Sequence, residues 1–494
     1  MTTATAPTPP PSPPTRAPAL EAQLREEAVF GRLPLLREER EYSTRGILAT
    51  GFSYAVAAWC FLIGGFAATY VDAIQGMVTL IAGSVIGVAL SSAAAAMACN
   101  RYGLEQIDYT KTAFGQHGAK LVLIFYVVNQ VGWTGMILVM FGRGVMNVAQ
   151  AFGFQGGESL VRVAVVLGLL AAYVVVVRGV HVLNVFNAVI TPGLLLATAF
   201  LFYAICRDGG WQTVLDATPI QPTGERALDN IIAFELGLGA GFSWWPGIGF
   251  LARNTDTQRN SVYPQILTMG LGMGVVCCTG LFAGLAFQAS DPTEWLIQAG
   301  GRGMGTAVLV LLGVANLSAS AIMMYTAALG LRHVRVLRAL PWKLLVALAF
   351  LPVLAYAVAP ELLYEKGNAF LTYNATMFAP ISGILLVDYF PLRRERINVS
   401  QVFEDHPSGH YWFTRGFNVV ALVAMLVGQV LYVWLLNPVS LETHGPVRST
   451  TASAPAFLVP TLFYAVATWA WGTRRGLGGY GAPTEALPLK QPNL

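Results

Sequence analysis

Charged residues are scarce in this chain of 494 residues. Asp, Glu, Lys and Arg make up 11% of the sequence, whereas 55% is hydrophobic and the mean hydropathy is +0.57. A soluble protein carries roughly twice that share of charge. The scarcity excludes an ordinary soluble domain. Because the apolar runs are about 20 residues long and do not alternate, they indicate an all-α membrane protein rather than a β-barrel.

Several functional motifs are also missing. The sequence contains no phosphate loop, zinc-binding spacing, nucleophile elbow or dinucleotide fingerprint in a suitable context. Its glycine-rich runs lie inside apolar segments, which argues against transport driven by ATP. The five cysteines lie in or at the ends of apolar segments, and we expect no disulfide. No group of His, Asp or Cys suits catalysis, so we predict no enzyme activity and no cofactor.

Apolar segments predict about twelve transmembrane helices. Their approximate ranges are 46–70, 75–98, 121–150, 161–178, 182–206, 228–251, 264–288, 305–330, 343–360, 367–389, 414–436 and 454–472. We expect a tail over residues 1–41, a transport core over 42–390 (spans one to ten), two further spans within 391–475, and a second tail over 476–494. The first tail is Pro-rich and then charged, so we expect it to be disordered and to stay in the cytoplasm.

Basic residues predict the orientation. With the N-terminus in the cytoplasm, 23 of the 30 Lys and Arg residues fall on the cytoplasmic side. The seven on the outer side are Arg143, Arg162, Arg207, Arg226, Arg302, Lys366 and Arg448. This asymmetry predicts a multi-pass protein of the inner or plasma membrane with both termini cytoplasmic. The net charge of +4 therefore reflects topology, and the expected partners are the lipid bilayer and a small molecule, with no nucleic acid. We expect a monomer or a weak oligomer.

The two halves of the chain resemble each other. Span one contains Gly51-Phe-Ser-Tyr54, and span six contains Gly241-Phe-Ser-Trp244 followed by Trp245 and Pro246. Glycine and proline weaken regular helical hydrogen bonding. Interrupted helices at matching places in two halves indicate an inverted repeat with a binding site between them. We therefore predict that helices one and six are discontinuous, with spans one to five repeated as spans six to ten.

Tryptophans within the spans suggest a stacking site. Trp133 of span three could stack on a flat ring, and Asn129, one turn earlier, could bond the edge of that ring. The alternative role of this segment is close helix packing through its glycines. Trp244 and Trp245 flank the break of span six, and either could supply a second face. We favour Trp245, because it directly precedes the Pro-Gly pair.

Other polar residues in the spans are candidate ligands. Glu235 could bond a substrate N–H or carry a proton, or it could simply be paired near the outer end of span six. In span eight, Ser318 and Ser320 could bind a cation together with carbonyls of span one, or bond back to their own helix. Asn316 could reach the substrate.

Several motifs resemble those of the nucleobase–cation symporter-1 family, which includes cytosine, purine, allantoin and hydantoin transporters. The loop after span two, the Gly-Trp-x-Gly of span three and the end of span ten carry the resemblance. The matching stretches include Asp108-Tyr109, Ala113-Phe-Gly115, Gly132-Trp-Thr-Gly135, Asn316-Leu-Ser318 and Ala379-Pro-Ile-Ser-Gly-Ile-Leu-Leu-Val-Asp388. The resemblance implies the five-plus-five inverted-repeat fold of sodium-coupled symporters and a base stacked between the tryptophans of spans three and six.

The resemblance also implies positions for the ligands. It places a Na⁺ site between spans one and eight, at Val56, Trp59, Ala315, Ser318 and Ala319, and it places Cys60 and Ile137 beside the substrate. Ile137 stands where relatives often have an amide, which leaves the substrate open. Ala319 stands where sodium-coupled members have a hydroxyl, although Ser320 is adjacent, so that both Na⁺ and H⁺ remain possible coupling ions.

The sequence therefore predicts a symporter for a nucleobase or a similar heterocycle. Stacking faces and edge hydrogen bonds suit a neutral planar ring. An alternative is a symporter for an amino acid, an amine or a thiamine-like cation on the same fold, which Glu235 would favour. A channel is a second alternative, and an interrupted, tryptophan-lined core argues against an open pore.

Overall fold

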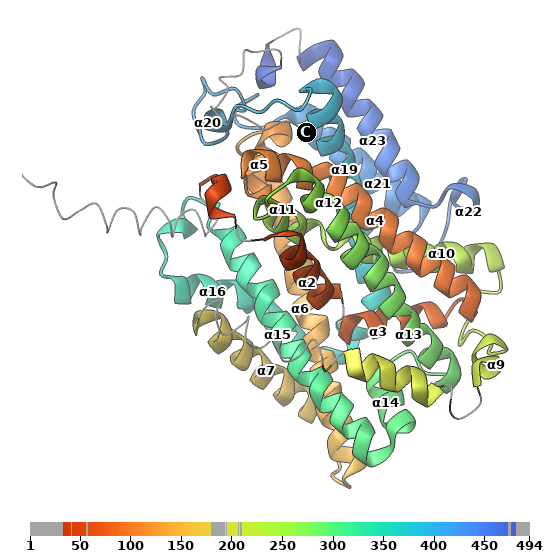
Figure 1. The fold of residues 1–494 in the computed structure, drawn as a ribbon. Helices are drawn as coiled ribbons and strands as arrows, with labels where there is room; N and C mark the ends of the chain where they lie inside the picture. Colours follow the sequence, from red (N-terminus) through yellow and green to blue (C-terminus); the bar gives the residue numbers. More distant parts are fainter. Residues whose placement is uncertain are drawn as a thin grey trace, which may run out of the picture.

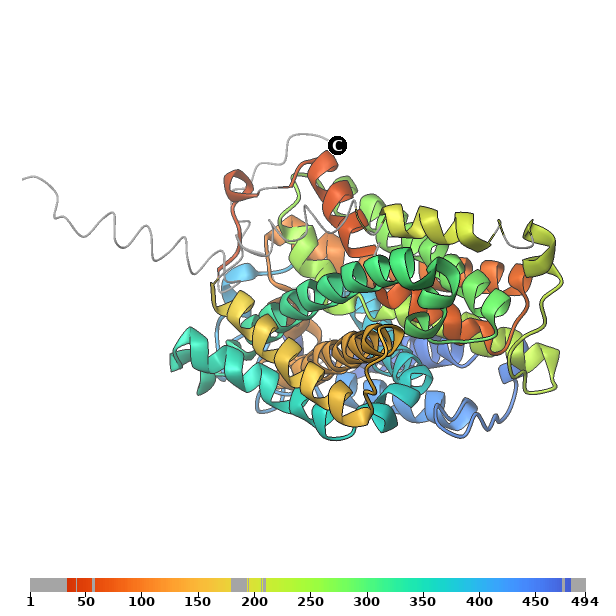
Figure 2. The same ribbon diagram turned by 90° about the horizontal axis from the view of Figure 1, so that it is seen from below.

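The computed structural model describes residues 33–40, 42–55, 58–178, 193, 195–205, 207, 210–472 and 476–480. Within these ranges the chain is helical, and its extended pairing is limited to isolated bridges. Seven described helices are long and apolar enough to cross a membrane, and shorter apolar helices accompany them. The predicted all-α membrane fold is confirmed. Figure 1 shows the helices packed into one bundle, and Figure 2 shows the same bundle from below.

The first half of the bundle contains spans one to five. Its helices are α2 (Thr44–Ala55), α3 (Ala58–Ala68), α4 (Ala73–Tyr102), α5 (Gln106–Phe114), α6 (Gly118–Ala151) and α7 (Glu158–Arg178). Both α2 and α3 belong to predicted span one. Residues 56 and 57 between them lie outside the described part of the chain, so the predicted interruption of span one stays a prediction. Of the predicted fifth span, the helical stretch Leu195–Ile205 is described.

The second half contains spans six to ten. Its helices are α9 (Gly210–Leu215), α10 (Arg226–Phe242), α11 (Trp245–Arg253), α12 (Gln258–Gln265), η2 (Ile266–Gly272), α13 (Met273–Phe287), α14 (Pro292–Gly300), η3 (Gly301–Gly305), α15 (Thr306–Leu331), α16 (Trp342–Phe350), η5 (Leu351–Val353), α17 (Leu354–Val358), α18 (Pro360–Glu365), α19 (Gly367–Val387) and η6 (Asp388–Leu392). Spans eleven and twelve follow as α21 (Val419–Leu435) and α23 (Ser453–Ala467). Short helices complete the described chain: η1 (Arg37–Glu39), η4 (Leu337–Ala339), α20 (Val399–Val402), α22 (Val447–Thr450), η7 (Thr468–Gly472) and η9 (Leu477–Gly479).

The break of span six is short. α10 ends at Phe242, and α11 begins at Trp245, so two residues lie between them. Ser243 and Trp244 keep right-handed helical dihedrals, and the Trp244 carbonyl accepts hydrogen bonds from the amides of Gly247 and Ile248. Pro246 lies in the first turn of α11, where its missing N–H costs no helical bond. The interruption is thus a tight turn that redirects the helix, rather than a stretch of extended backbone.

Glycines join the two halves. A Cβ atom on Gly64 of α3 would overlap the carbonyl oxygen of Cys277 in α13, and one on Gly280 of α13 would overlap that of Phe61 in α3. Glycine therefore lets these two backbones touch. Glycine allows the same close backbone contact between α4 and α10, where a Cβ on Gly83 would lie 2.6 Å from the Phe234 carbonyl oxygen. Span one thus packs on span seven, and span six on span two, which interlocks the repeats.

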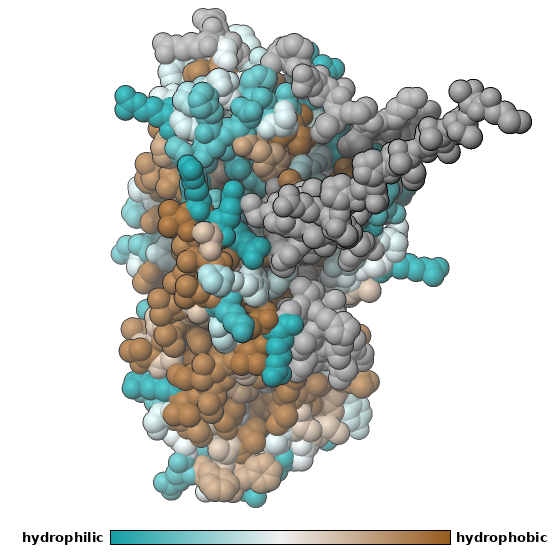
Figure 3. Space-filling view, turned by 90° about the vertical axis from the view of Figure 1, so that its left-hand side faces the viewer, coloured by the Kyte–Doolittle hydropathy of each residue, from teal (hydrophilic) through white to brown (hydrophobic). Residues whose placement is uncertain are grey.

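The remaining helices surround this core. α6 runs through the middle of the bundle, where it contacts α7, α15 and α19 (Figures 1 and 2). α7 and α16 lie on one side of the molecule, and α21 and α23 lie on the other (Figure 1). Hydrophobic side chains gather over the middle and lower part of the face in Figure 3, and hydrophilic ones gather at its upper end. Such a band suits the hydrocarbon layer of a bilayer.

Candidate substrate site

Three tryptophans meet where spans one, three and six come together. The ring centroid of Trp59 in α3 lies 5.2 Å from that of Trp133 in α6 and 5.5 Å from that of Trp244 between α10 and α11. The planes are inclined by 58° and 61°, so the indoles pack at an angle rather than stack. Trp59 and Trp133 are buried, and Trp244 is half-buried. We call these three residues the tryptophan cluster.

Trp244 and Trp245 point to different parts of the core. The indole N–H of Trp244 contacts the sulfur of Met273 at 3.2 Å, on the side of the tryptophan cluster. Trp245 is fully buried and stacks on Phe378 of α19, with centroids 5.2 Å apart and planes inclined by 15°. In this structure Trp244, rather than Trp245, lies with Trp59, which in turn contacts Trp133. The preference for Trp245 as the residue that faces the substrate stays a prediction. Consecutive helical residues project about 100° apart, so only one of the two can enter the cluster.

Phe370 of α19 covers the other edge of Trp133. Their centroids lie 5.4 Å apart with planes at 81°. A Cβ atom on Gly132 would overlap the Phe370 ring, so the glycine before Trp133 makes room for this contact. The close-packing role predicted for these glycines is thus present, and it positions Trp133 at the same time.

An amide pair lies one helical turn from this contact. Asn129 of α6 donates through its Nδ2 to the Oδ1 of Asn374 in α19 at 2.7 Å. Both residues are completely buried. The remaining Asn129 Oδ1 and Asn374 Nδ2 are buried without a partner among the described residues. Exchanging the oxygen and nitrogen of both amides would still leave one acceptor and one donor.

The span-eight candidates lie on α15. Ala315, Ser318 and Ala319 have the i, i+3, i+4 spacing of one helix face, and α15 contacts α3. Ser318 and Ser320 are both buried, and the Ser320 hydroxyl has no partner within the described ranges. The arrangement puts span eight beside span one, as a cation site there requires. Val56, the predicted carbonyl ligand, lies outside the described residues.

Ile137 and Asn316 lie between α6 and α15. Both side chains are buried. Asn316 lines a cavity of about 220 Å³ whose other walls are almost entirely apolar, among them Met140, Val148 and Leu312. Asn316 is therefore the polar side chain of an otherwise apolar cavity. The contacts described above for the tryptophan cluster do not include Asn316.

Glu235 belongs to a different part of the molecule. Its buried carboxylate accepts hydrogen bonds from the Tyr432 hydroxyl at 2.7 Å, from the backbone amides of Ala452 and Ser453 at 2.8 Å each, and from the Ser453 hydroxyl. These partners lie on α21 and at the start of α23. A carboxylate with four donors is satisfied, so Glu235 fastens α10 to the last two spans. This arrangement matches the second role considered for Glu235, a paired carboxylate, and its role as a substrate ligand stays a prediction.

Cys60 also has a local partner. Its buried thiol donates to the Ala55 carbonyl at 2.9 Å. The thiol therefore has a hydrogen-bond partner within span one, five residues earlier in the chain. The resemblance to the symporter family placed Cys60 beside the substrate, and that placement stays a prediction.

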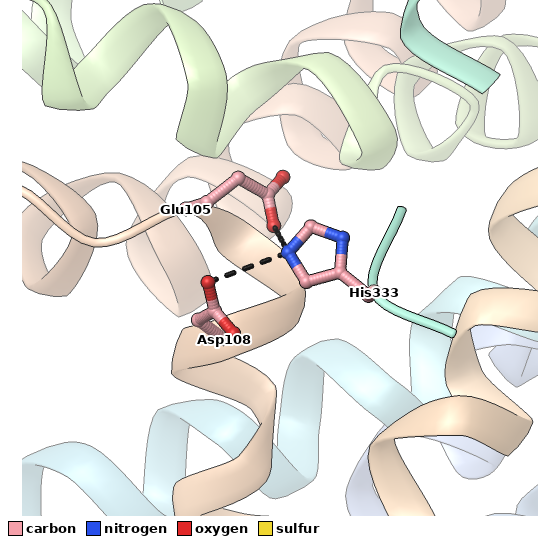
Figure 4. Close-up of side chains that lie close together, drawn as sticks. All are labelled: Glu105, Asp108 and His333. Carbon is pink, nitrogen blue, oxygen red and sulfur yellow. Dashed lines mark hydrogen bonds and ion pairs between the residues drawn. The ribbon is translucent and has the colours of Figure 1, made fainter. Parts of the chain in front are cut away.

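A cluster of charged side chains lies at one end of the bundle. The Nε2 of His333, just beyond α15, lies 3.3 Å from Asp108 and 3.4 Å from Glu105, at the start of α5 (Figure 4). Lys111 pairs with Asp108 at 2.5 Å. Burial opposes the charged forms, but the opposite charges prevail: the pKa of His333 is raised above 6.5, and the pKa of Asp108 is held far below its usual value. We call these four residues the inner ion cluster.

Some residues of the tryptophan region and of the inner ion cluster were not predicted from the sequence. They are Phe370, Asn374, Glu105 and His333, and Trp59 was predicted only as a backbone ligand. Asn374 could have been found, because it is an amide inside an apolar span, the feature that identified Asn129. The contact of Phe370 with Trp133 and the pairing of His333 with Asp108 each join segments that are far apart in the sequence. No local sequence pattern indicates either contact.

The fold is that of a known class of transporter. The structure resembles the inward-facing conformation of Mhp1 with a TM-score of 0.75 at 18% identity, covering 90% of this chain and 93% of that one. It also resembles the closed conformation of Mhp1, a nucleobase-cation-symport-1 family transporter with bromovinylhydantoin bound (TM-score 0.73, 18% identity, 92% and 97% covered). The predicted five-plus-five inverted-repeat fold is thereby confirmed.

Sequence comparison gives the family. A family profile described as permease for cytosine/purines, uracil, thiamine, allantoin matches residues 34–472. The chain belongs to this family, the nucleobase–cation symporter-1 family. It is 23% identical to the purine-uracil permease NCS1 of Arabidopsis thaliana over 67% of this chain, a match that spans 58% of the plant protein. It is also 23% identical to the cytosine permease of Escherichia coli strain K12, over 84% of this chain and 86% of that protein.

Proposed function

We propose that this protein imports a nucleobase or a related small heterocycle, of the cytosine, purine, uracil, allantoin or hydantoin type. Uptake would be coupled to Na⁺ or H⁺ and would proceed by alternating access across the inner or plasma membrane. One observation carries the proposal. The tryptophans of spans one, three and six meet in the core, and an incompletely paired amide couple lies one turn from Trp133.

The chemistry of this region suits a flat, uncharged ring. An aromatic face contributes about 0.5–1.5 kcal/mol to a ring contact beyond the burial of area. The free acceptor and donor of Asn129 and Asn374 complement the adjacent N–H and C=O groups at the edge of a cyclic amide. The four hydrogen bonds that Glu235 accepts within the protein favour a neutral substrate over an amine or thiamine-like cation, which is the alternative.

Trp59 is the residue of the proposed site that we expect substrate binding to displace. Its ring contacts both Trp133 and Trp244 in this structure. A base that stacks on Trp133 and Trp244 together would have to displace Trp59 from at least one of these contacts. We therefore expect substrate binding to be linked to a shift of α3, the outer half of span one, relative to α6.

Ion clusters at both ends of the bundle support alternating access. At one end, Arg143 of α6 pairs with Asp291 before α14 at 2.6 Å and with Glu361 of α18 at 2.5 Å. At the other end, the inner ion cluster joins α5 to the segment after α15. Because each cluster ties together segments from different spans, the two could break in turn as one bundle rocks against the other.

Uptake competition tests the substrate class. Cells expressing the protein would be given labelled cytosine, uracil, hypoxanthine, allantoin and hydantoin in turn, with unlabelled lysine and thiamine as competitors. We expect saturable uptake of at least one heterocycle that lysine and thiamine do not inhibit. Uptake of lysine or thiamine with no effect of any heterocycle would contradict the proposal.

Ion replacement tests the coupling. Uptake would be measured with Na⁺ replaced by choline, and separately with a protonophore in constant Na⁺. Loss of uptake in choline, together with a similar loss in Ser318→Ala, would support Na⁺ binding between α3 and α15. Loss with the protonophore alone, and normal uptake in Ser318→Ala, would support H⁺. Uptake insensitive to both treatments would contradict a symport mechanism.

A further inference from the structure

A cleft opens beside the inner ion cluster. Its volume is about 370 Å³, and it lies between α5, the start of α6, the segment after α15 and the segment after α20. The polar side chains that line it are mostly basic: Lys111, Lys120, Arg332, His333, Arg335 and Arg338, against Asp108 and Asp405. It is separate from the tryptophan cluster, and the proposed transport function assigns no ligand to it.

The positive charge of this cleft is not balanced within the described chain. Asp108 is occupied by Lys111 and His333, and Asp405 lies 3.5 Å from His117. No carboxylate among the described residues lies within 4.0 Å of the charged groups of Lys120, Arg335 or Arg338. Arg335 and Arg338 are exposed. Three cations therefore line one hollow without a counter-ion from the described residues, which is the setting for an anionic group that can accept several hydrogen bonds.

Exposed apolar side chains also lie near the cleft. Val336, between the two arginines, is 81% exposed, and Phe403, which lines the cleft, is also exposed. Trp342 lies under Arg332 with its ring 5.3 Å from the guanidinium carbon, at the start of span nine. Tryptophan at the end of a span is typical of the membrane–water interface. An anion that binds here would thus have apolar surface beside it, which favours a ligand with a phosphate head and hydrocarbon chains over a free phosphate.

We propose that this cleft binds the phosphate headgroup of an anionic membrane phospholipid through Lys120, Arg335 and Arg338. The site lies at the end of the bundle that the distribution of basic residues assigns to the cytoplasm, where anionic lipids attract basic clusters. Because Asp108 and His333 line the same cleft, a bound lipid would contact the segment after α15 and α5 together. Its presence would thus strengthen the connection between span eight and the loop after span two.

Native mass spectrometry of the purified full chain tests this proposal. The probes would be phosphatidylglycerol and phosphatidylcholine with the same acyl chains, each titrated into the detergent-solubilised protein. The cleft variant would be Arg335→Gln/Arg338→Gln. The matched control would be Arg394→Gln/Arg396→Gln, which removes two exposed arginines that lie elsewhere.

We expect the wild-type protein and the control to retain phosphatidylglycerol with similar affinity and to bind phosphatidylcholine at least tenfold more weakly. Each basic residue near an anionic surface contributes roughly a fivefold gain in affinity, so the cleft variant should lose about 25-fold. Equal retention by the cleft variant and the control would overturn the site. Equal binding of the two lipids would overturn the role of charge, and displacement by an equal concentration of inorganic phosphate would assign the site to a soluble anion.

A second variant keeps the test valid if the cleft variant is destabilised. If the melting temperature of the cleft variant falls well below that of the control, Lys120→Gln would replace it, because this change removes one cation from a half-buried position. About fivefold weaker retention of phosphatidylglycerol by Lys120→Gln would then support the site, and unchanged retention would overturn it.

Discussion

Asn129 and Asn374 are joined across α6 and α19 by one amide hydrogen bond of 2.7 Å, and each keeps a buried polar atom without a described partner. Leaving a buried amide atom unpaired costs about 1–3 kcal/mol. A pair that carries two such atoms beside the tryptophan cluster is costly unless another molecule satisfies them. In the proposed transport cycle, the edge of the substrate does so.

The first prediction separates the stability of this amide pair from its role in binding. Asn129→Leu alone should lower the melting temperature, because it leaves the whole Asn374 amide buried and unpaired, at a cost of about 1–3 kcal/mol. Asn129→Leu/Asn374→Leu should restore most of that stability, since both polar partners are gone. Uptake should nevertheless stay at background in the double variant. Recovery of uptake along with stability would show that the pair serves only to hold α6 against α19.

The second prediction concerns the tryptophan cluster. Trp133→Ala should abolish measurable uptake at normal surface expression, because it removes a stacking face that contributes about 0.5–1.5 kcal/mol beyond its buried area. Trp133→Phe keeps a flat face and should retain part of the activity. Near wild-type uptake in Trp133→Ala would refute the stacking role.

The two neighbouring tryptophans of span six should behave differently. Trp244→Phe should raise KM for uptake by about tenfold, which corresponds to about 1.4 kcal/mol, because Trp244 lies in the tryptophan cluster. Trp245→Phe should leave KM unchanged and lower the melting temperature, because Trp245 stacks on Phe378 in a closed part of the core. Both properties would be measured on the same preparations, and the reverse pattern would mean that Trp245 is the residue that contacts substrate.

The third prediction assigns Glu235 a structural role. Tyr432→Phe removes one of the donors to the buried Glu235 oxygens and should cost about 1–3 kcal/mol, the range for a buried polar group that loses its partner. Glu235→Gln should also lower the melting temperature, because it weakens all four contacts with α21 and α23. Neither change should alter the order in which heterocycles compete for uptake. A changed order of competition in Glu235→Gln would indicate that Glu235 contacts the substrate.

The sequence was sufficient for features that are local in the chain. Glycine and Pro246 act on their own backbone, so the interruption of span six could be predicted. The predicted interruption of span one falls on residues 56 and 57, which lie outside the described chain. The choice between Trp244 and Trp245 could not be predicted, because it depends on the rotation of the helix at the break, and neighbouring residues differ by about 100°. Glu235 shows a second limit of prediction from a single sequence. Its partners Tyr432 and Ser453 lie about 200 residues further along the chain, and a single sequence carries no signal of that contact.

The last prediction concerns the pH dependence of the inner ion cluster. The pKa of His333 is raised above its ordinary 6.5 by Asp108 and Glu105, despite burial. Folding therefore favours protonated His333, and this stabilisation is complete below pH 6.5 and is lost as the pH rises through the folded-state pKa. The pKa of Asp108 is lowered from 3.8, so its contribution is complete above pH 3.8 and is lost only in stronger acid. Both contributions are thus present together between pH 3.8 and 6.5.

The melting temperature in detergent should accordingly fall as the pH is raised from about 6.5 towards 9, by an amount that depends on His333. His333→Gln keeps a polar side chain of similar length but cannot gain a proton, so its melting temperature should change less over the same interval. Glu105→Gln removes one of the two carboxylates that raise the pKa of His333, and it should shift the decline to lower pH. If His333→Gln shows the same pH dependence as the wild-type protein, the stabilising charge lies elsewhere, and His333 does not hold α5 to the end of α15 by its proton.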